Sequence, residues 1–380
     1  MTFELTKEQS MLLDLVREFS QNEVAPLAEE IDRSGRFPLE TVEKMVKVGL
    51  FGLNIPESYG GVGMSEVCKV LAVSEMAKAC ASTAEMYAVQ LLVNAIISMN
   101  GNDAQKKEYF GRTLKGELGA FALTEPGAGS DAGSLQTVAV KEGDHYVING
   151  SKCFISNLGP EEGSYAIVIA LTDPAKKTHG GMTAFLVDRD NPGFKVGKTE
   201  DKMGIRAAAV SELILEDCIV DEDHILGRVG DGFRIAMSGL DSGRIGIASQ
   251  ACGEAARALE LAVEYSKQRK QFKKPISSNQ GIQWYLSEMA TDLEAARLLT
   301  LQAADLRDRK QPAGMNASMA KFFAAEMAVR VAGKALQIHG GYGFIKDYEI
   351  ERIYRDARIL TIYEGTSEVQ KIVIAKNLLK

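Results

Sequence analysis

Apolar residues recur at helical spacing through the first third of the chain. Met11, Leu12, Leu15 and Phe19 follow the i, i+3, i+4 pattern that predicts an amphipathic helix. A second stripe lies within 42–50, and a long stretch at 65–100 is apolar nearly all round, which predicts a buried helix. Upstream of the first stripe, the letters TKEQ form a capping box, which indicates a helix start. These patterns predict an all-helical N-terminal domain over residues 1–120.

Near residue 119 the spacing changes from helical to alternating. Segments 138–140 and 146–148 flank a polar turn, which is typical of a β-hairpin. Further strands are predicted at 166–171, 182–187 and 211–215. Residues in the middle of the chain, 121–228, are therefore expected to form a small antiparallel β-barrel or sandwich.

Helical spacing returns after the strands. Long stretches rich in Ala and Leu run through 245–269, 280–308 and 316–339, and a tail helix is expected from about Glu368. The pattern predicts that residues 229–380 form an antiparallel four-helix bundle. The chain as a whole is expected to be an α+β protein of three domains.

Composition narrows the possible functions. The chain of 380 residues has a net charge of -7, which argues against a nucleic-acid binder with a concentrated basic face. No apolar run approaches the length needed to span a bilayer, and the first residues lack a signal-peptide pattern. The five cysteines are scattered and the four histidines lack ligand spacing. The expectation is a metal-free cytoplasmic protein with no nucleic-acid partner and no membrane insertion.

The strongest candidate for chemistry is Glu364. It lies between an aromatic residue and a glycine, after an apolar run that includes Ile359, Leu360 and Ile362. Poor solvation raises a carboxyl pKa and makes the ionised group a stronger base. The pattern alone equally fits a surface glutamate in a turn before the last helix.

Four stretches of this sequence resemble the acyl-CoA dehydrogenase family, in the same order along the chain. They are 123–131 (LTEPGAGSD), 150–157 (GSKCFISN), 337–343 (QIHGGYG) with the later pair 355–356, and 363–366 (YEGT). The likeness covers essentially the whole chain and is greatest to the short-chain branch, the butyryl-CoA dehydrogenases and acryloyl-CoA-reducing relatives. It implies the same order of helical, β and helical domains.

The resemblance also implies an activity. Glu364 would remove the α-proton of a short-chain acyl-CoA while FAD accepts the β-hydride at N5, giving the trans-2-enoyl-CoA. Electron-transferring flavoprotein is the implied electron partner, and a homotetramer the implied assembly. The same chemistry run in reverse, as an enoyl-CoA reductase, stays open. A flavin-dependent oxidase that uses oxygen is a further alternative, and so is a flavin-binding scaffold without activity.

Cofactor contacts follow from the same resemblance. The isoalloxazine side would be held by Phe121, Leu123, Thr124, Ser130, Phe154, Ile155 and Ser156. Gln337, Gly340 and Gly341 resemble the segment that lies along the FAD pyrophosphate from a neighbouring subunit, and a second cofactor contact is implied at Arg269, Phe272 and Gln280. Thr366 with Glu368 would lie near the adenosine half. From the residues alone, 124–130 also fits a strand-to-strand turn. Gly340 would at the same time cap a helix.

Substrate contacts are implied at Ser130, Asp241, Arg244, Tyr363 and Gly365, with the Glu364 amide donating to the thioester oxygen. By spacing alone, the Asp and Arg three residues apart would form an ordinary ion pair on a helix surface.

Two positions bear on the choice of substrate and base. Some relatives take the base from the position of Gly243, and glycine cannot serve there, which strengthens the assignment to Glu364. Glu85 interrupts an apolar stretch that in the family helps to shape the acyl pocket. A polar residue there would suit a polar or conjugated acyl tail, or it would face another helix or solvent. The sequence does not fix the acyl chain, the physiological direction, or a stable complex with the flavoprotein.

Overall fold

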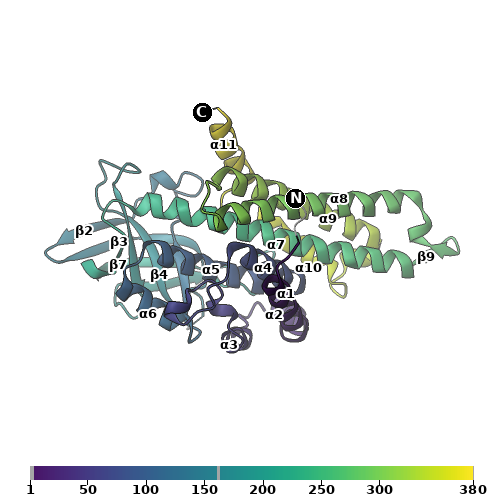
Figure 1. Cartoon of the computed structure of the whole chain (residues 1–380), viewed down its shortest axis with the longest axis horizontal. Coiled ribbons are helices and arrows are strands. Elements are labelled where there is room, and N and C mark those ends of the chain that lie inside the picture. The colour runs from purple at the N-terminus through teal and green to yellow at the C-terminus, as the bar shows by residue number, and fades with distance from the viewer. Residues whose placement is uncertain (1–3, 161–162, 380) are drawn as a thin grey trace.

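The computed structural model describes residues 4–160 and 163–379, and it consists of a helical region, a β-sheet and a bundle of long helices (Figure 1). The first three residues, on which part of the signal-peptide argument depends, lie outside the described residues. The N-terminal helices are α1 (Lys7–Phe19), α2 (Ala28–Ser34), α3 (Leu39–Lys47), α4 (Glu66–Ala79), α5 (Ala81–Asn100) and α6 (Asp103–Thr113).

The start of α1 confirms the predicted capping box. The Thr6 hydroxyl accepts a hydrogen bond from the Gln9 N–H at 3.2 Å, and the Gln9 side chain accepts from the Thr6 N–H at 2.9 Å. The prediction of one helix over 65–100 is wrong in one respect, because Cys80 is extended (φ -159°) and separates α4 from α5. Both helices are buried on most sides, as their all-round apolar character indicated.

The sheet is built from β1 (Leu118–Ala122), β2 (Val138–Glu142), β3 (His145–Ser156), β4 (Gly163–Leu171), β5 (Met182–Asp188), β6 (Phe194–Thr199), β7 (Val210–Asp221) and β8 (Ile225–Leu226). Its order is β6-β7-β3-β2-β4-β5-β8, with β1 paired to β4. The predicted hairpin is confirmed, because β2 and β3 pair antiparallel up to Glu142 and His145.

The expectation of a purely antiparallel sheet needs one correction. β1 runs parallel to β4, and β2 makes a single parallel pair with β4. Parallel neighbours need a long connection between them, and the β2–β3 hairpin lies within the connection from β1 to β4. Such pairing depends on contacts far apart in sequence, which local alternation cannot reveal.

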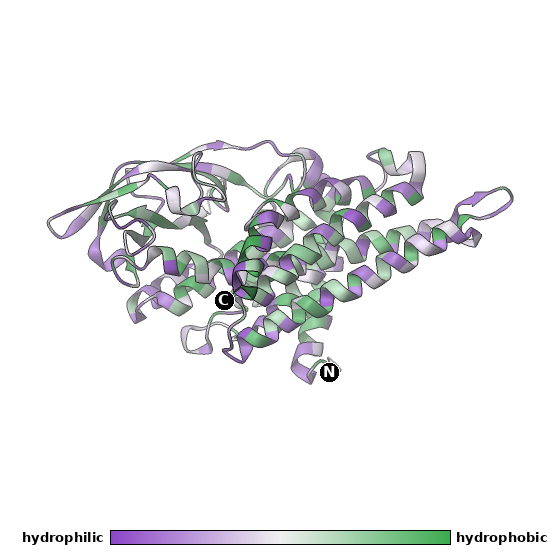
Figure 2. Cartoon of the chain, turned by 90° about the horizontal axis from the view of Figure 1, so that it is seen from above, coloured by the Kyte–Doolittle hydropathy of each residue, from purple (hydrophilic) through white to green (hydrophobic). Residues whose placement is uncertain are grey.

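The C-terminal bundle contains α7 (Gly232–Gln268), α8 (Gln280–Asp308) and α9 (Gly314–His339), followed by α10 (Ile350–Ala357) and α11 (Ser367–Leu378). Its core is rich in alanine, including Ala255, Ala317 and Ala324, which allows close approach of α7 and α9. A small hairpin of β9 (Lys270–Gln271) and β10 (Lys274–Pro275) joins α7 to α8. Seen from above, this hairpin and the sheet lie at opposite ends of the molecule (Figure 2).

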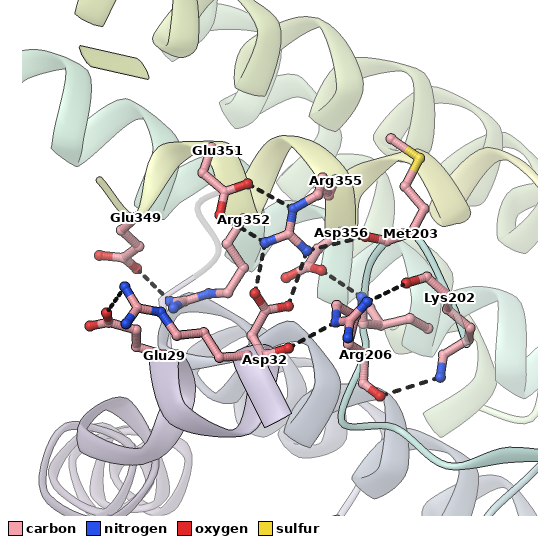
Figure 3. A network of polar contacts seen from close by, with 12 residues as sticks. Glu29, Asp32, Lys202, Met203, Arg206, Glu349, Glu351, Arg352, Arg355 and Asp356 are labelled. Atoms are coloured by element: carbon pink, nitrogen blue, oxygen red, sulfur yellow. Dashed lines mark hydrogen bonds and ion pairs between the residues drawn. The ribbon is translucent and has the colours of Figure 1, made fainter. Parts of the chain in front are cut away.

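A network of charges joins the three regions near α10 (Figure 3). The Arg355 guanidinium donates to Asp32 of α2 at 2.7 Å and to Glu351 at 2.7 Å. The neighbouring Asp356 carboxylate accepts from the Ile205 N–H, in the loop after β6, at 2.5 Å. These bonds hold the chain just before Glu364 against both the helical region and the sheet.

Candidate active site

The segment that carries Glu364 is a short loop between α10 and α11 with a constrained backbone. Glu364 has φ 53° and Gly365 has φ 90°, and the left-handed region is costly for a residue with a Cβ. The loop is held by hydrogen bonds that its carbonyl oxygens accept from neighbouring side chains. Gln370 donates to the Glu364 and Gly365 carbonyl oxygens at 3.1 and 2.9 Å, and the Lys321 ammonium donates to the Gly365 carbonyl at 2.6 Å. Thr366 then caps α11 by accepting from Val369 N–H.

The carboxyl group of Glu364 is partly enclosed, in a residue of intermediate exposure. Within the part of the chain that the structure describes, its Oε2 atom is buried and accepts no hydrogen bond. Burial raises the pKa of Glu364 to about 7, although Arg244 and Lys321 oppose the shift, and Glu85 adds to it. The segment is indeed a turn before the last helix, but the carboxyl is not a surface group. A carboxyl that ionises near neutral pH suits a general base.

Helix α7 leaves room for this carboxyl at Gly243. A Cβ at position 243 would stand 2.4 Å from the Glu364 Oε2 atom, closer than any ordinary contact. Gly243 therefore has a steric role, because its small size makes space for the carboxyl of Glu364. The next residue, Arg244, is 7% exposed and pairs with Asp241 at 2.7 Å. The predicted ion pair exists, but Arg244 is buried rather than on the helix surface.

Two of the segments that resemble the family, 123–131 and 150–157, meet at one end of the sheet. The Cys153 N–H donates to the Thr124 carbonyl at 3.0 Å, and the Lys152 ammonium donates to the Leu123 carbonyl at 3.2 Å. Phe154, the next residue, has φ 58° and its side chain is 66% exposed. A large exposed aromatic ring beside a fixed polar loop is a suitable surface for a flat ligand.

The other residues that were expected to hold the isoalloxazine side of the cofactor differ in exposure. Phe121 lies on β1 opposite Ile167 and is partly buried, whereas Ser130 is exposed. Ile155 is 1% exposed and packs inside the sheet, so only its backbone is available to a cofactor. The turn interpretation of the loop is confirmed, since Glu125 and Ala128 exchange backbone hydrogen bonds at 3.2 and 3.0 Å.

Glu85 joins this group from α5. Its side chain is 2% exposed and accepts a hydrogen bond from the Ser156 hydroxyl at 2.6 Å. Burial raises the pKa of Glu85 to about 7, against the weaker effects of Ser156 and Lys202. The interpretation that Glu85 faces solvent is therefore wrong.

The remaining predicted cofactor contacts lie elsewhere in the chain. Arg269 and Phe272 belong to the hairpin end of the bundle, far from the sheet in both views (Figures 1 and 2). Phe272 is 93% exposed, and the Arg269 guanidinium lies 5.4 Å from the ring centre of Tyr342. Gly340 ends α9 with φ 61°, as the cap interpretation predicted. The set at this end is Arg269, Phe272, Gln280, Gln337, Gly340 and Gly341, all of them exposed.

Sequence reasoning missed the residues that hold the loop of Glu364. Lys321 is completely buried in α9, among alanines such as Ala320 and Ala324. A single lysine within an apolar stripe is a usable signal, because a buried ammonium needs acceptors. Gln370 offered no comparable signal, since α11 mixes polar and apolar residues without a distinct apolar face. Thr366 and the exposed Glu368 do lie together at the start of α11.

Two general findings apply to the described ranges 4–160 and 163–379. None of their helices combines the length and apolar character needed to cross a bilayer. Their His, Cys, Asp and Glu side chains form no cluster of three or more arranged to hold a metal ion.

Comparison with known proteins identifies relatives over the whole length. Three acyl-CoA dehydrogenase domain models match: the N-terminal domain at residues 6–117, the middle domain at 120–218 and the C-terminal domain at 230–379. The acryloyl-CoA reductase (NADH) of Anaerotignum propionicum is 49% identical, covering 100% of this chain and 96% of its own. The caffeyl-CoA reductase–Etf complex subunit CarC of Acetobacterium woodii is 44% identical, covering 99% of each chain.

Among solved structures, butyryl-CoA dehydrogenase from Megasphaera elsdenii matches with a TM-score of 0.97 and 42% identity, covering 100% of both chains. The match extends over the helical regions and the sheet together, so it concerns the whole three-domain fold. The chain belongs to the acyl-CoA dehydrogenase family of oxidoreductases.

Proposed function

We propose that this protein is an FAD-dependent short-chain acyl-CoA dehydrogenase that converts a butyryl-CoA-like thioester to the trans-2-enoyl-CoA. The observation that carries the proposal is the Glu364 carboxyl, whose Oε2 atom is buried beside Gly243 without a hydrogen-bond partner among the described residues and whose pKa is raised to about 7. In this role Glu364 removes the α-proton. The name of the butyryl-CoA dehydrogenase relative supports a short acyl chain.

The residues at the end of the sheet fit a flavin. Phe154 offers an exposed ring, Thr124 lies on a loop fixed by Cys153, and Ser156 supplies a hydroxyl. Phe121, Leu123, Ser130 and the Ile155 backbone would complete this side. Bound there, FAD would supply the acceptor for the β-hydride of the acyl group, which no side chain can accept.

The loop of Glu364 would also polarise the thioester. Negative charge grows on the thioester oxygen as the α-proton leaves, and donors already in position stabilise it most effectively. The Glu364 N–H is the proposed donor, held in place because Lys321 and Gln370 bind the following carbonyls. Gly365 allows the substrate to approach this backbone without a Cβ.

Other substrate contacts are proposed at Asp241, Arg244, Ser130 and Tyr363. The Arg244 Nε atom is buried and, among the described residues, has no acceptor, so the acyl-CoA is its proposed partner. The Tyr363 hydroxyl donates to Gln250 at 2.9 Å, which leaves its ring rather than its hydroxyl to face the acyl chain.

A homotetramer is part of the proposal because one copy separates the proposed FAD contacts into two groups. The hairpin and Gly340 groups lie at the end of the bundle opposite the sheet. A Cβ at Gly340 or Gly341 would meet no atom of the described chain within 4 Å. The positive φ of Gly340 accounts for that glycine, but Gly341 has no such reason within one copy. Exposed Ile372 and Leu379 on and after α11 are further candidates for burial between subunits.

The proposed electron partner is electron-transferring flavoprotein in the cytoplasm. A relative that is named as a subunit of a reductase–Etf complex supports this choice. The name of the acryloyl-CoA reductase relative also favours the second candidate, the same chemistry run towards the saturated thioester. Both directions use Glu364, as base in oxidation and as acid in reduction.

An anaerobic titration with butyryl-CoA tests the proposal. The flavin absorbance of the FAD-loaded protein should bleach, and a Glu364→Gln variant that retains FAD should not bleach. A protein that fails to bind FAD would overturn the proposal. Reduced enzyme mixed with crotonyl-CoA tests the reverse direction, where reoxidation of the flavin is the expected result.

A further inference from the structure

Glu85 is a carboxyl group in an environment that disfavours charge. It lies in the first half of α5 between the fully buried Ala84 and Met86, and only 2% of its surface is exposed. Removing a carboxylate from water costs several kcal/mol unless hydrogen bonds or a cation compensate. A glutamate at such a position therefore needs a reason beyond packing.

The compensation that the chain itself supplies is incomplete. One carboxyl oxygen, Oε1, accepts from the Ser156 hydroxyl at 2.6 Å. The other, Oε2, is buried and accepts from no group among residues 4–160 and 163–379. Lys202 is the nearby cation, but its ammonium donates to the Ala208 carbonyl at 2.7 Å and, among the described residues, forms no ion pair with Glu85. One acceptor oxygen is left for a ligand.

The packing of α5 places Glu85 near the proposed catalytic site, because Tyr363 of the base loop packs against a cluster that includes Ala81, one helical turn before Glu85. Glu85 interacts electrostatically with Glu364 and with Tyr363, the two residues at the centre of the base loop. Ser156, its hydrogen-bond donor, follows the exposed ring of Phe154 by two residues. Thus Glu85 and Glu364, from α5 and from the loop before α11, each leave one buried carboxyl oxygen unpartnered in the same region.

We propose that Glu85 is a specificity-determining residue, which selects acyl groups that carry a hydrogen-bond donor, a hydroxyl or an ammonium, at the end remote from the thioester. The inference rests on the proposed acyl-CoA dehydrogenation. A plain alkyl end would leave the Glu85 oxygen buried without a partner, whereas a donor would satisfy it. Sites built to bind a polar group reject analogues that lack it far more strongly than apolar pockets distinguish one methylene.

Acyl groups of equal size separate donor chemistry from shape. Butyryl-, 3-hydroxypropionyl- and β-alanyl-CoA carry a methyl, a hydroxyl and an ammonium at the same position, and pentanoyl- with 4-hydroxybutyryl-CoA repeat the first comparison one carbon further out. The FAD-loaded protein is titrated anaerobically with each thioester. Dissociation constants come from calorimetry and from the shift of the flavin band, and reduction rates from its bleaching.

The expected result is that a hydroxyl- or ammonium-bearing thioester binds on the order of tenfold to a hundredfold more tightly than its methyl counterpart. Glu85→Leu should abolish or reverse this preference, while Glu85→Gln should keep the hydroxyl preference better than the ammonium preference. Comparing the hydroxyl-bearing with the ammonium-bearing thioester shows whether the preferred acyl group is neutral or cationic. Because Glu85→Gln is isosteric, it keeps the test valid if the leucine variant folds poorly.

Two different failures are distinguishable. If butyryl-CoA bleaches the flavin, but both variants discriminate among the thioesters as the unmodified protein does, the role of Glu85 is refuted and the dehydrogenase proposal stands. If no thioester binds or bleaches the flavin, the proposed function itself is refuted, and the inference falls with it. A merely structural role for Glu85 would lower stability without changing the ratio of dissociation constants.

Discussion

Replacing Lys152 by methionine should destabilise the loop that is proposed to hold the flavin. Lys152 is 1% exposed, and its ammonium donates to the Glu125 carboxylate at 2.7 Å and to the Leu123 carbonyl at 3.2 Å. Burial raises the pKa of Glu125, but the charge of Lys152 and several hydrogen bonds outweigh it and lower the pKa overall. Lys152→Met therefore leaves the buried Glu125 carboxylate without its cation.

The expected loss follows from the burial of both partners. Removing one partner of a buried ion pair typically costs about 3–5 kcal/mol. The Thr137 N–H, the Thr137 hydroxyl and the Gln136 N–H still donate to Glu125, at 3.0, 2.6 and 2.6 Å, so the lower part of that range applies. With an unfolding entropy of about 2.1 cal/mol/K per residue over 380 residues, about 3 kcal/mol lowers the melting temperature by roughly 4 °C.

Thermal unfolding measured by circular dichroism, with FAD retention on gel filtration, tests this expectation. The double variant Lys152→Met with Glu125→Gln removes both charges and should recover most of the lost stability, because a neutral pair of similar size avoids the unpaired charge. If the double variant is as unstable as the single variant, the loss comes from packing, and the electrostatic reasoning is refuted.

Three further predictions concern the loop of the proposed base. The value of kcat/KM should rise with pH through about pH 7, because Glu364 acts in its ionised form. Removing the charge of Glu85 lowers the pKa of Glu364, so Glu85→Gln should move this rise to lower pH. Gly243→Ala should reduce kcat on the order of a hundredfold, because the added Cβ displaces the Glu364 carboxyl. Gly246→Ala is the control and should keep activity, since its Cβ would meet its nearest neighbours at 3.9 Å. Equal effects of the two substitutions would contradict the steric argument. Lys321→Met should lower kcat more than it changes KM, because it removes a hydrogen bond to the Gly365 carbonyl. It should also move the pH profile to higher pH, since Lys321 lowers the pKa of Glu364. An unchanged profile would show that the charge of Lys321 does not affect the pKa of Glu364.

Features that depend on neighbouring residues were predictable from the sequence. The Thr6 capping box and the β2–β3 hairpin are encoded within a few positions, and both are confirmed. The break at Cys80 was missed because no glycine or proline marks it. The parallel pairing of β1 with β4 was missed because strand partners far apart in sequence leave no local pattern.

The candidate site shows the same division. Glu364 and Gly243 were singled out by residue type, but their steric complementarity depends on how α7 lies against the base loop. Glu85 was recognised as unusual and the apolar stretch around it predicted a buried helix, but the group that Glu85 faces could not be inferred, because Ser156 lies 71 positions further along the chain. Lys321 lies 43 positions before Glu364, and only the packing of α9 against the loop brings its ammonium to the Gly365 carbonyl.

The two groups of proposed FAD contacts are separated by the length of α7. Gly243 lies beside Glu364, and the helix rises about 1.5 Å per residue, so Arg269 lies roughly 39 Å further along the same bundle. Side chains at both ends cannot hold the same part of one cofactor within one copy. A second copy, related by a twofold axis, would bring its hairpin end to the first copy's Glu364 end, and the same contact would complete both sites. In the proposed assembly, exposed Phe272 and Gly341, around whose position a Cβ would meet no atom of the described chain within 4 Å, would contact the second copy.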